Sequence, residues 1–239
     1  MLPIEGYETS AGCTGRIPAG RSLDDLVSAV NLLKSGGVVA MPTDTLFGLG
    51  ADVNNEAALQ KVFDIKGRPA DLALPVLVSD WKQVSQVAEG LSEAHRRLAS
   101  AFWPGCLTLV LPKSRTLSPL ITAGRETVAV RMPNHWVPLA LASKLGGPIT
   151  GTSANRSGQP NLETVQEVEA ELGNTVDMVI LEGPAPDGLQ STIVDLTSGY
   201  PALLREGAAS FAEVERAWKS ANSCVATESA IRAERARGQ

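Results

Sequence analysis

Two cationic side chains, Lys66 and Arg68, stand on either side of one glycine in the stretch Lys66-Gly67-Arg68-Pro69. Their charged ends can converge on one ligand, and such donors bind phosphate or carboxylate groups well. The same pattern is also typical of a solvated helix C-terminus, where basic residues are favoured. From residue types alone the solvated helix end is the more common of the two. Both interpretations stay open at this point.

Two pairs of neutral polar residues follow short apolar runs of the kind that form strands. Thr43 and Thr45 are two residues apart, as are Ser153 and Asn155. Side chains two apart point the same way from an extended backbone. Thr, Ser and Asn are also ordinary loop and capping residues, which spacing alone favours. Because ligands of open α/β sheets bind at strand ends, the two pairs together with the basic turn indicate a polar pocket beside a sheet.

Two arginines, Arg131 and Arg205, lie near the ends of other predicted strands. An arginine can hold a carboxylate or phosphate through two parallel hydrogen bonds. A surface ion pair is an equally good interpretation of each from the sequence.

Several kinds of active site are excluded by motif. The sequence has no G-x-x-x-x-G-K-[ST] phosphate loop, no G-x-G-x-x-G dinucleotide turn and no G-x-S-x-G nucleophile elbow. Its two histidines, His95 and His135, fall on predicted helices, and no His/Cys cluster suggests zinc. We therefore expect no tight metal site, and chemistry that depends on positioning and electrostatics.

The basic turn is positioned by a predicted strand at 38–41 and a predicted helix that ends at Lys66. Leu59, Val62, Phe63 and Lys66 recur at helical spacing, and Asn54 or Asn55 can cap the start. Pro69 cannot continue the helix. Between strand and helix, residues 48–50 (Gly-Leu-Gly) are predicted to be flexible.

Strand and helix signals alternate along the rest of the chain. This favours an α/β fold, and adjacent strand signals near the C-terminus favour a twisted mixed sheet, parallel and antiparallel, with helices packed around it. The predicted helices are 22–33, 81–89, 92–102, 135–145, 163–172 and 211–221. The further predicted strands are 74–78, 106–111, 127–132, 149–152, 178–181, 191–196 and 202–205.

The 239 residues fit one large domain. We expect an irregular N-terminal arm at 1–20, the main domain at 21–222 and a C-terminal tail of frayed helix or disorder at 223–239. A net charge of −5 and 4% aromatic residues argue against a broad nucleic-acid surface. Three scattered cysteines, with no secretory signal and no long apolar run, indicate a cytoplasmic protein without a membrane span.

Five motifs occur in one order: PTDTLFGLG, KGRP, TSAN, STIVDLT and LLREG. With the Lys-x-Arg pair and the later Ser-x-Asn pair, they resemble the YrdC-like family of L-threonylcarbamoyladenylate synthases over about residues 36–207. The resemblance is to the short form, because only about 30 residues follow Gly207. It implies a YrdC-like fold, with 21–222 as the catalytic domain.

The resemblance also implies a reaction. L-threonine, bicarbonate and ATP would give L-threonylcarbamoyl-adenylate and pyrophosphate, with Mg²⁺ accompanying ATP. Downstream threonylcarbamoyl-transferase proteins would then modify the adenosine beside the anticodon of certain transfer RNAs. Lys66 and Arg68 would be catalytic and would bind ATP with Asn155 and Arg205. The implied threonine-binding residues are Thr45, Arg131, Ser153 and Ser191.

Three residues depart from the family pattern. Phe47 replaces a common tyrosine, Leu77 stands near a common histidine, and Glu206 replaces the usual proline beside Arg205. Two other functions remain open. One is adenylation of another carbamoyl group by a related module, and the other is a non-catalytic RNA-binding module.

Overall fold

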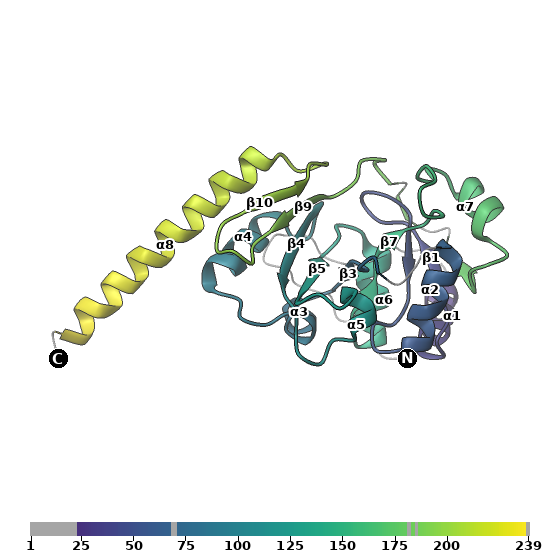
Figure 1. The fold of residues 1–239 in the computed structure, drawn as a ribbon, viewed down its shortest axis with the longest axis horizontal. Helices are drawn as coiled ribbons and strands as arrows, with labels where there is room; N and C mark the ends of the chain where they lie inside the picture. The colour runs from purple at the N-terminus through teal and green to yellow at the C-terminus, as the bar shows by residue number, and fades with distance from the viewer. Residues whose placement is uncertain (1–22, 68–70, 181–182, 185, 238–239) are drawn as a thin grey trace.

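The computed structural model describes residues 23–67, 71–180, 183–184 and 186–237, and within these the strands form two sheets (Figure 1). The four-stranded sheet has the order β7-β2-β1-β8 and the six-stranded sheet the order β10-β9-β4-β5-β3-β6. The first contains β1 (Val39–Met41), β2 (Gly48–Gly50), β7 (Thr152–Ser153) and β8 (Met178–Val179). The second contains β3 (Val76–Leu77), β4 (Leu107–Pro112), β5 (Thr127–Arg131), β6 (Ile149–Thr150), β9 (Thr192–Asp195) and β10 (Ala202–Arg205).

Both sheets are mixed, which confirms the predicted α/β class. Strand β1 runs parallel to β8 and antiparallel to β2, while β4 runs parallel to β9 and antiparallel to β5. The prediction of a single sheet was too simple, because the strand signals cannot say which strands share one sheet. The two predicted strands at 191–196 and 202–205 do pair antiparallel, as β9 and β10.

Helices surround the two sheets, and Figure 1 shows α1, α2 and α7 on the side of β1. Among the described residues, the helix bounds are α1 (Leu23–Lys34), α2 (Glu56–Lys66), α3 (Trp81–Val87), α4 (Glu93–Phe102), α5 (Pro119–Thr122), α6 (Trp136–Leu145), α7 (Val165–Leu172) and α8 (Phe211–Arg237). The α5 segment was not expected to be helical; it is a single short turn of four residues begun by Pro119.

Helix α2 forms where the spacing predicts it. The Asn55 side chain accepts a hydrogen bond from the Ala58 amide, 3.1 Å, and so caps the first turn. Gly67 ends the helix in the left-handed conformation, with φ of 59°. The apolar face, including Val62 and Phe63, is buried in the main core. The C-terminal end of α2 lies beside Ser153 of β7, because the ammonium group of Lys66 donates a hydrogen bond to the Ser153 carbonyl.

The segment predicted to be flexible, 48–50, is instead the buried strand β2. It pairs with β1 on one side and β7 on the other. A Cβ at Gly50 would lie 3.1 Å from Met41 Cε and 3.3 Å from Val39 Cγ2. The prediction was wrong because glycine was taken as a sign of flexibility, whereas here it allows a close approach.

The single strand predicted at 149–152 divides at Gly151. Strand β6 pairs with β3 in the larger sheet, and β7 pairs with β2 in the smaller one. A Cβ at Gly151 would lie 2.4 Å from Leu77 Cγ, so the chain passes between the sheets only because this residue has no side chain. The passage brings Ser153 between the two sheets.

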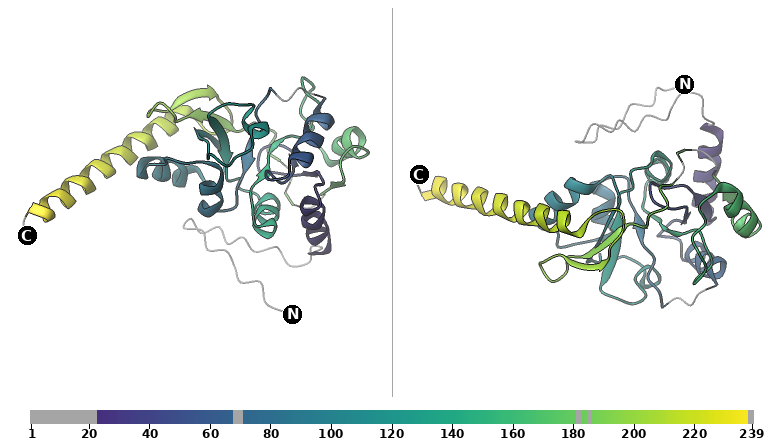
Figure 2. Two further views of the ribbon diagram at one scale, coloured as in Figure 1. Left: turned by 60° about the horizontal axis from the view of Figure 1, so that its bottom comes forward. Right: turned by 90° about the horizontal axis from the view of Figure 1, so that it is seen from above.

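Helix α8 is longer than predicted: it continues past Ala221 to Arg237 and projects from the body toward the C-terminus (Figure 2). Its first turns pack against α4, with Val214 and Trp218 buried. The helix predicted to end at Ala221 therefore ended too early, and the tail, predicted as frayed helix or disorder, is helical up to Arg237. Burial decides helix length only over the first turns, and local propensity carries the rest. The arm predicted at 1–20 lies outside the described residues, and the division at 222 stays a prediction.

Every helix in the described part of the chain is too short or too polar to cross a membrane.

Candidate active site

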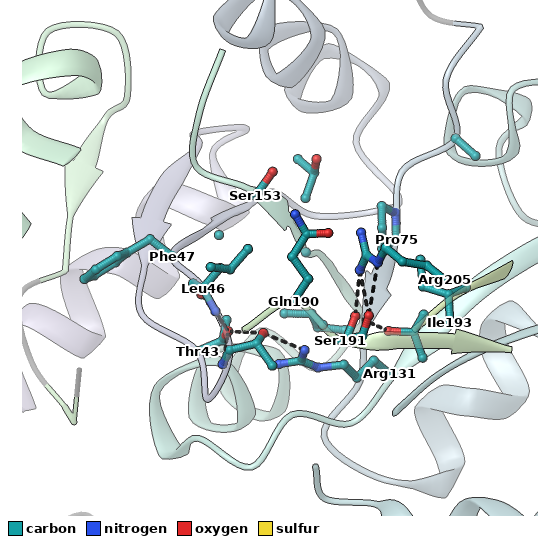
Figure 3. A pocket seen from close by; sticks show the side chains of 17 residues that line it. Thr43, Leu46, Phe47, Pro75, Arg131, Ser153, Gln190, Ser191, Ile193 and Arg205 are labelled. Carbon is teal, nitrogen blue, oxygen red and sulfur yellow. Dashed lines mark hydrogen bonds between the residues drawn. The ribbon is translucent and has the colours of Figure 1, made fainter. Parts of the chain in front are cut away.

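A cavity of about 250 Å³ lies where the two sheets meet (Figure 3). Of the eight residues to which the resemblance gives a role, five line it: Thr45, Arg131, Ser153, Ser191 and Arg205. They come from the β1–β2 turn, β5, β7, the start of β9 and β10. The other lining residues are Thr43, Leu46, Phe47, Gly48, Ala73, Pro75, Leu77, Thr108, Gly151, Thr152, Gln190 and Ile193.

The turn after β1 is closed by its own hydroxyl groups. Thr43 Oγ1 donates to the Leu46 carbonyl, 2.6 Å, and accepts from the amides of Thr45 and Leu46 at 3.1 and 3.2 Å. The two threonine hydroxyls also share a hydrogen bond of 3.1 Å. This local network fixes the turn and presents Thr45 Oγ1 to the neighbouring strand β5.

Arg131, at the end of β5, joins that turn through a buried ion pair. Its Nη1 donates to Thr45 Oγ1, 2.7 Å, and its Nη2 donates to Asp44 Oδ1. The side chains of Arg131 and Asp44 are only 6% and 13% exposed, so the surface ion pair considered from sequence is excluded. Its Nε is buried and has no hydrogen-bond partner among the described residues.

Burial lowers the pKa of Arg131, and the nearby Asp44 carboxylate opposes this shift. An arginine starts from so high a pKa that it stays protonated at neutral pH. The cavity wall therefore carries a fixed cation whose orientation is set by a carboxylate and a hydroxyl.

Arg205 approaches the cavity from β10, the edge strand of the larger sheet. It is exposed, and its Nε and Nη2 donate to the Ser191 carbonyl at 3.1 and 2.8 Å. The Ser191 hydroxyl accepts from Arg205 Nη2, 3.2 Å, and from Thr108 Oγ1, 2.9 Å. Partial burial and the charge of Arg131 lower the pKa of Arg205. Two guanidinium groups thus face one cavity, whose described lining contains no Asp or Glu.

Lys66 lies next to the cavity wall and not on its surface. Its ammonium group donates to the Ser153 carbonyl, 2.6 Å, the Asn155 carbonyl, 2.7 Å, and Asn155 Oδ1, 3.3 Å. The residue is 3% exposed, which excludes the solvated helix end. In this structure Lys66 therefore fixes the turn that carries Ser153.

Asn155 completes that turn. Its Oδ1 accepts from Ser153 Oγ, and its Nδ2 donates to the Gln159 carbonyl, both at 2.6 Å. Asn155 is buried behind Ser153 and does not line the cavity. The predicted Lys66, Ser153 and Asn155 are thus brought together, while Arg68 lies outside the described residues.

The three departures from the family pattern have different surroundings. The Phe47 ring packs in the main core and is directed away from Arg131 and Ser191 (Figure 3). Leu77 contributes an apolar side chain to the cavity. Glu206 Oε1 accepts from the Phe211 amide, 3.2 Å, at the start of α8 and not in the cavity.

Sequence reasoning missed three residues at or beside the cavity: Thr108 and Gln190, which line it next to Ser191, and Asp44, which orients Arg131 from behind the wall. Asp44 could have been found, because it lies between the two threonines that were singled out. Gln190 immediately precedes Ser191 and offered the same kind of signal. Thr108 gave none, since it looks like any residue of a buried strand.

The two histidines act as helix caps. His95 Nδ1 accepts from the Ser92 amide, 3.0 Å, at the start of α4, and His135 Nδ1 accepts from the Val137 amide, 3.2 Å, at the start of α6. Among the described residues, no group of three or more His, Cys, Asp or Glu could hold a metal ion.

A family model with the description "Telomere recombination", named for Sua5, YciO and YrdC, matches residues 31–207. The chain belongs to the Sua5/YciO/YrdC family. A threonylcarbamoyl-AMP synthase from Vibrio vulnificus is 39% identical over 187 residues, which are 77% of this chain and 100% of that protein. The threonylcarbamoyl-AMP synthase of Pyrococcus abyssi is 40% identical over 188 residues, 79% of this chain.

A solved structure agrees with this membership. The crystal structure of P. abyssi Sua5 complexed with L-threonine matches with a TM-score of 0.77 and 39% identity, over 80% of this chain and 56% of that one. The chain therefore has the YrdC-like fold that its motifs implied. It spans only 55% of the length of the P. abyssi relative.

Proposed function

We propose that this protein makes L-threonylcarbamoyl-adenylate and pyrophosphate from L-threonine, bicarbonate and ATP, for the threonylcarbamoyladenosine modification of transfer RNA. The observation that carries the proposal is the meeting of Thr45, Arg131, Ser153, Ser191 and Arg205 in one cavity. Relatives at about 40% identity carry the corresponding name, which supports the same choice of reaction.

The charge of the cavity suits an amino acid bound through its carboxylate. Arg131 is fixed by Asp44 and Thr45, so little reorganisation is needed when an anion arrives. Ser153 and Ser191 supply hydroxyl oxygens, and Leu46, Leu77 and Ile193 supply an apolar surface for a methyl group. In the proposed complex, Thr45, Arg131, Ser153 and Ser191 hold L-threonine.

The size of the cavity indicates which of the two substrates it would hold. A volume of about 250 Å³ is below the roughly 300–1,000 Å³ of common small-molecule pockets. It suits an amino acid better than a whole nucleotide, so ATP would lie partly outside it. We assign Arg205, Asn155, Lys66 and Arg68 to the ATP side, with Lys66 and Arg68 as the catalytic cations.

The proposed reaction has two steps. The ammonium group of threonine and bicarbonate form a carbamate, with loss of water and a proton. A carbamate oxygen then attacks the α-phosphorus of ATP, and the bond from that phosphorus to pyrophosphate breaks. The protein has to align the two substrates and stabilise negative charge on the phosphate oxygens. The guanidinium of Arg205, which faces the cavity, is suited to that task.

Mg²⁺ would enter with ATP. Magnesium keeps several waters and is commonly held by substrate phosphates with few protein ligands. That mode fits a site whose described residues offer no cluster of carboxylates. The labile product would pass to downstream threonylcarbamoyl-transferase proteins in the cytoplasm.

The proposal is tested by pyrophosphate release from ATP and Mg²⁺, with L-threonine and bicarbonate each added or omitted. Wild-type protein should need both. Lys66→Ala should lower the rate at least about 100-fold, because it removes charged hydrogen bonds to the turn that carries Ser153. Lys61→Ala removes an exposed lysine from the same helix and is the matched control.

The other outcomes separate the alternatives. Release that ignores threonine would overturn the substrate assignment. Turnover of carbamoyl phosphate with ATP would then identify a related adenylating module. If no turnover occurred with either, salt-dependent RNA affinity without threonine binding would identify an RNA-binding module.

A further inference from the structure

Gln190 differs from nearly all the other polar side chains around the cavity. It lines the cavity, and Figure 3 shows its side chain pointing inward in the direction of Ser153. Its amide makes no hydrogen bond to any described residue, although the group can donate twice and accept twice. Among the described lining residues only Thr152 shares this property. The side chains of Gln190 and Thr152 therefore make no hydrogen bond to the described residues, whereas the other polar side chains of the cavity wall do.

The hydroxyls of Thr43, Ser153 and Thr108 have already used their protons, and the Ser191 hydroxyl already accepts from two described side chains. Thr43 donates to the Leu46 carbonyl, Ser153 donates to Asn155 Oδ1, and Thr108 donates to Ser191 Oγ. These oxygens can accept from a ligand but cannot also donate to it. The two arginines can only donate. A ligand group that both donates and accepts therefore finds in the Gln190 amide a donor and an acceptor together, both unused among the described residues.

The backbone of Gln190 is held firmly even though its side chain makes no hydrogen bond to the part of the chain that the structure describes. The Gln190 carbonyl accepts from the Ala208 amide, 2.9 Å. A Cβ added at Gly207 would lie 2.1 Å from that same carbonyl oxygen, so the two segments are in close backbone contact. Gln190 is thus positioned as precisely as its neighbour Ser191, which argues against an idle surface side chain.

We propose that Gln190 recognises the side-chain hydroxyl of the amino-acid substrate and so selects threonine over amino acids that lack it. The proposal rests on the function proposed above. Arg131 is the partner for the substrate carboxylate, which is an acceptor only. A hydroxyl needs an acceptor for its proton and a donor for its oxygen, and one amide supplies both. Leu77, on the apolar part of the wall, supplies neither.

The test compares L-threonine with L-2-aminobutyrate, which has hydrogen in place of the hydroxyl. In wild-type protein kcat/KM should favour threonine by about 10- to 100-fold, as expected for one or two well-made hydrogen bonds to a substrate hydroxyl. Gln190→Met keeps the length of the side chain and removes its hydrogen bonding. It should bring the ratio to within about three-fold of unity by lowering the value for threonine alone.

Two controls keep the result interpretable. Thr152→Val removes the other uncommitted group and should leave the ratio closer to wild type than Gln190→Met does. A thermal melt of each variant shows whether the fold is intact. A merely structural role for Gln190 would lower kcat/KM for both amino acids equally, and an unchanged ratio would overturn the proposal. So would a ratio that collapses in Thr152→Val and survives in Gln190→Met.

Titration calorimetry with the two amino acids measures the same preference as a ratio of dissociation constants, without turnover. A protein that binds threonine with Gln190-dependent selectivity but releases no pyrophosphate would contradict the proposed synthase and support the recognition. A protein that turns over threonine with unaltered selectivity in Gln190→Met would do the reverse.

Discussion

The cavity has two walls that are built differently. The inner wall consists of the 43–46 turn, Arg131 and Ser153, and its polar groups are bonded to Asp44, Lys66 and Asn155 behind them. The edge wall consists of Gln190, Ser191 and Arg205, at the ends of β9 and of the edge strand β10. All four residues of β10 are exposed, whereas Arg131 is buried.

This difference separates positioning from selection. A buried, internally bonded wall holds its charge in one orientation before a ligand arrives, which favours catalysis. A wall on an edge hairpin has fewer contacts to lose, so its side chains can change with little effect on the fold. We therefore expect substitutions in the inner wall to affect stability and activity together, and substitutions in the edge wall to affect activity or selectivity alone.

The largest effect is expected for Arg131→Met. The change leaves the Asp44 carboxylate buried without its cation, which should cost about 3–5 kcal/mol in the free energy of unfolding. Urea denaturation measures this cost. Adding Asp44→Asn should restore part of the stability but not threonine binding. If the double variant were no more stable than Arg131→Met, the ion pair would not be what holds the inner wall together.

A smaller loss is expected for Gly151→Ala. The new methyl group would lie 2.4 Å from Leu77 Cγ, and overpacking of this kind costs about 1–3 kcal/mol. Thermal unfolding should therefore begin at a lower temperature. Leu77→Ala removes the side chain that clashes. Adding Gly151→Ala to a protein that carries Leu77→Ala should therefore cost less stability than adding it to the wild-type protein, which is a partial recovery of the loss. No recovery would mean that Gly151 is needed for its backbone and not for the space.

For the edge wall, Arg205→Ala should change the free energy of unfolding by less than about 0.5 kcal/mol, because the side chain is exposed. Its rate of pyrophosphate release should still fall about 10-fold or more, through loss of a cation facing the substrates. Arg205→Lys keeps the charge but not the forked geometry. Its rate of pyrophosphate release should lie between the rates of wild-type protein and Arg205→Ala. A large drop in stability for either variant would erase the distinction between the two walls.

The smallest effect concerns Cys106, which lies near the inner wall. Burial and the Asp44 carboxylate raise the pKa of its thiol. Because the thiolate is the reactive form, a raised pKa leaves less of it at pH 8, and alkylation should be slower than for an exposed thiol. A chain with Cys13→Ser and Cys224→Ser isolates the reaction. Adding Asp44→Asn should shift its pH midpoint downward, and an upward shift would contradict this account.

Local rules predicted much of the framework. The Asn55 cap, the Gly67 end and the apolar face of α2 are all visible in sequence, since each depends on residues within a few positions. The same rules failed at 48–50, where glycine permits a buried strand against Met41, and beyond Ala221, where α8 continues. In both places the outcome depends on what packs, or does not pack, against the segment.

The candidate site also divides into features that the sequence predicted and features that depend on packing. Motif order indicated Lys66, Ser153 and Asn155 together, and the structure joins them by hydrogen bonds. It did not indicate that Lys66 is buried behind the cavity, nor that Asp44 orients Arg131. Those facts depend on contacts between residues 86 to 89 positions apart in the chain.

The sequence by itself determined the α/β class, most of the helices and strands, and a set of polar residues of which five line one cavity, because periodicity, caps and motifs are local in the chain. Only the tertiary structure decided that 149–153 passes from one sheet to the other, that Lys66 bonds to a turn instead of facing solvent, and that Gln190 faces the cavity uncommitted. These outcomes depend on which polar groups form hydrogen bonds once distant segments of the chain have packed together. A buried cation such as Lys66 has to form such bonds, because an unpaired buried charge is costly.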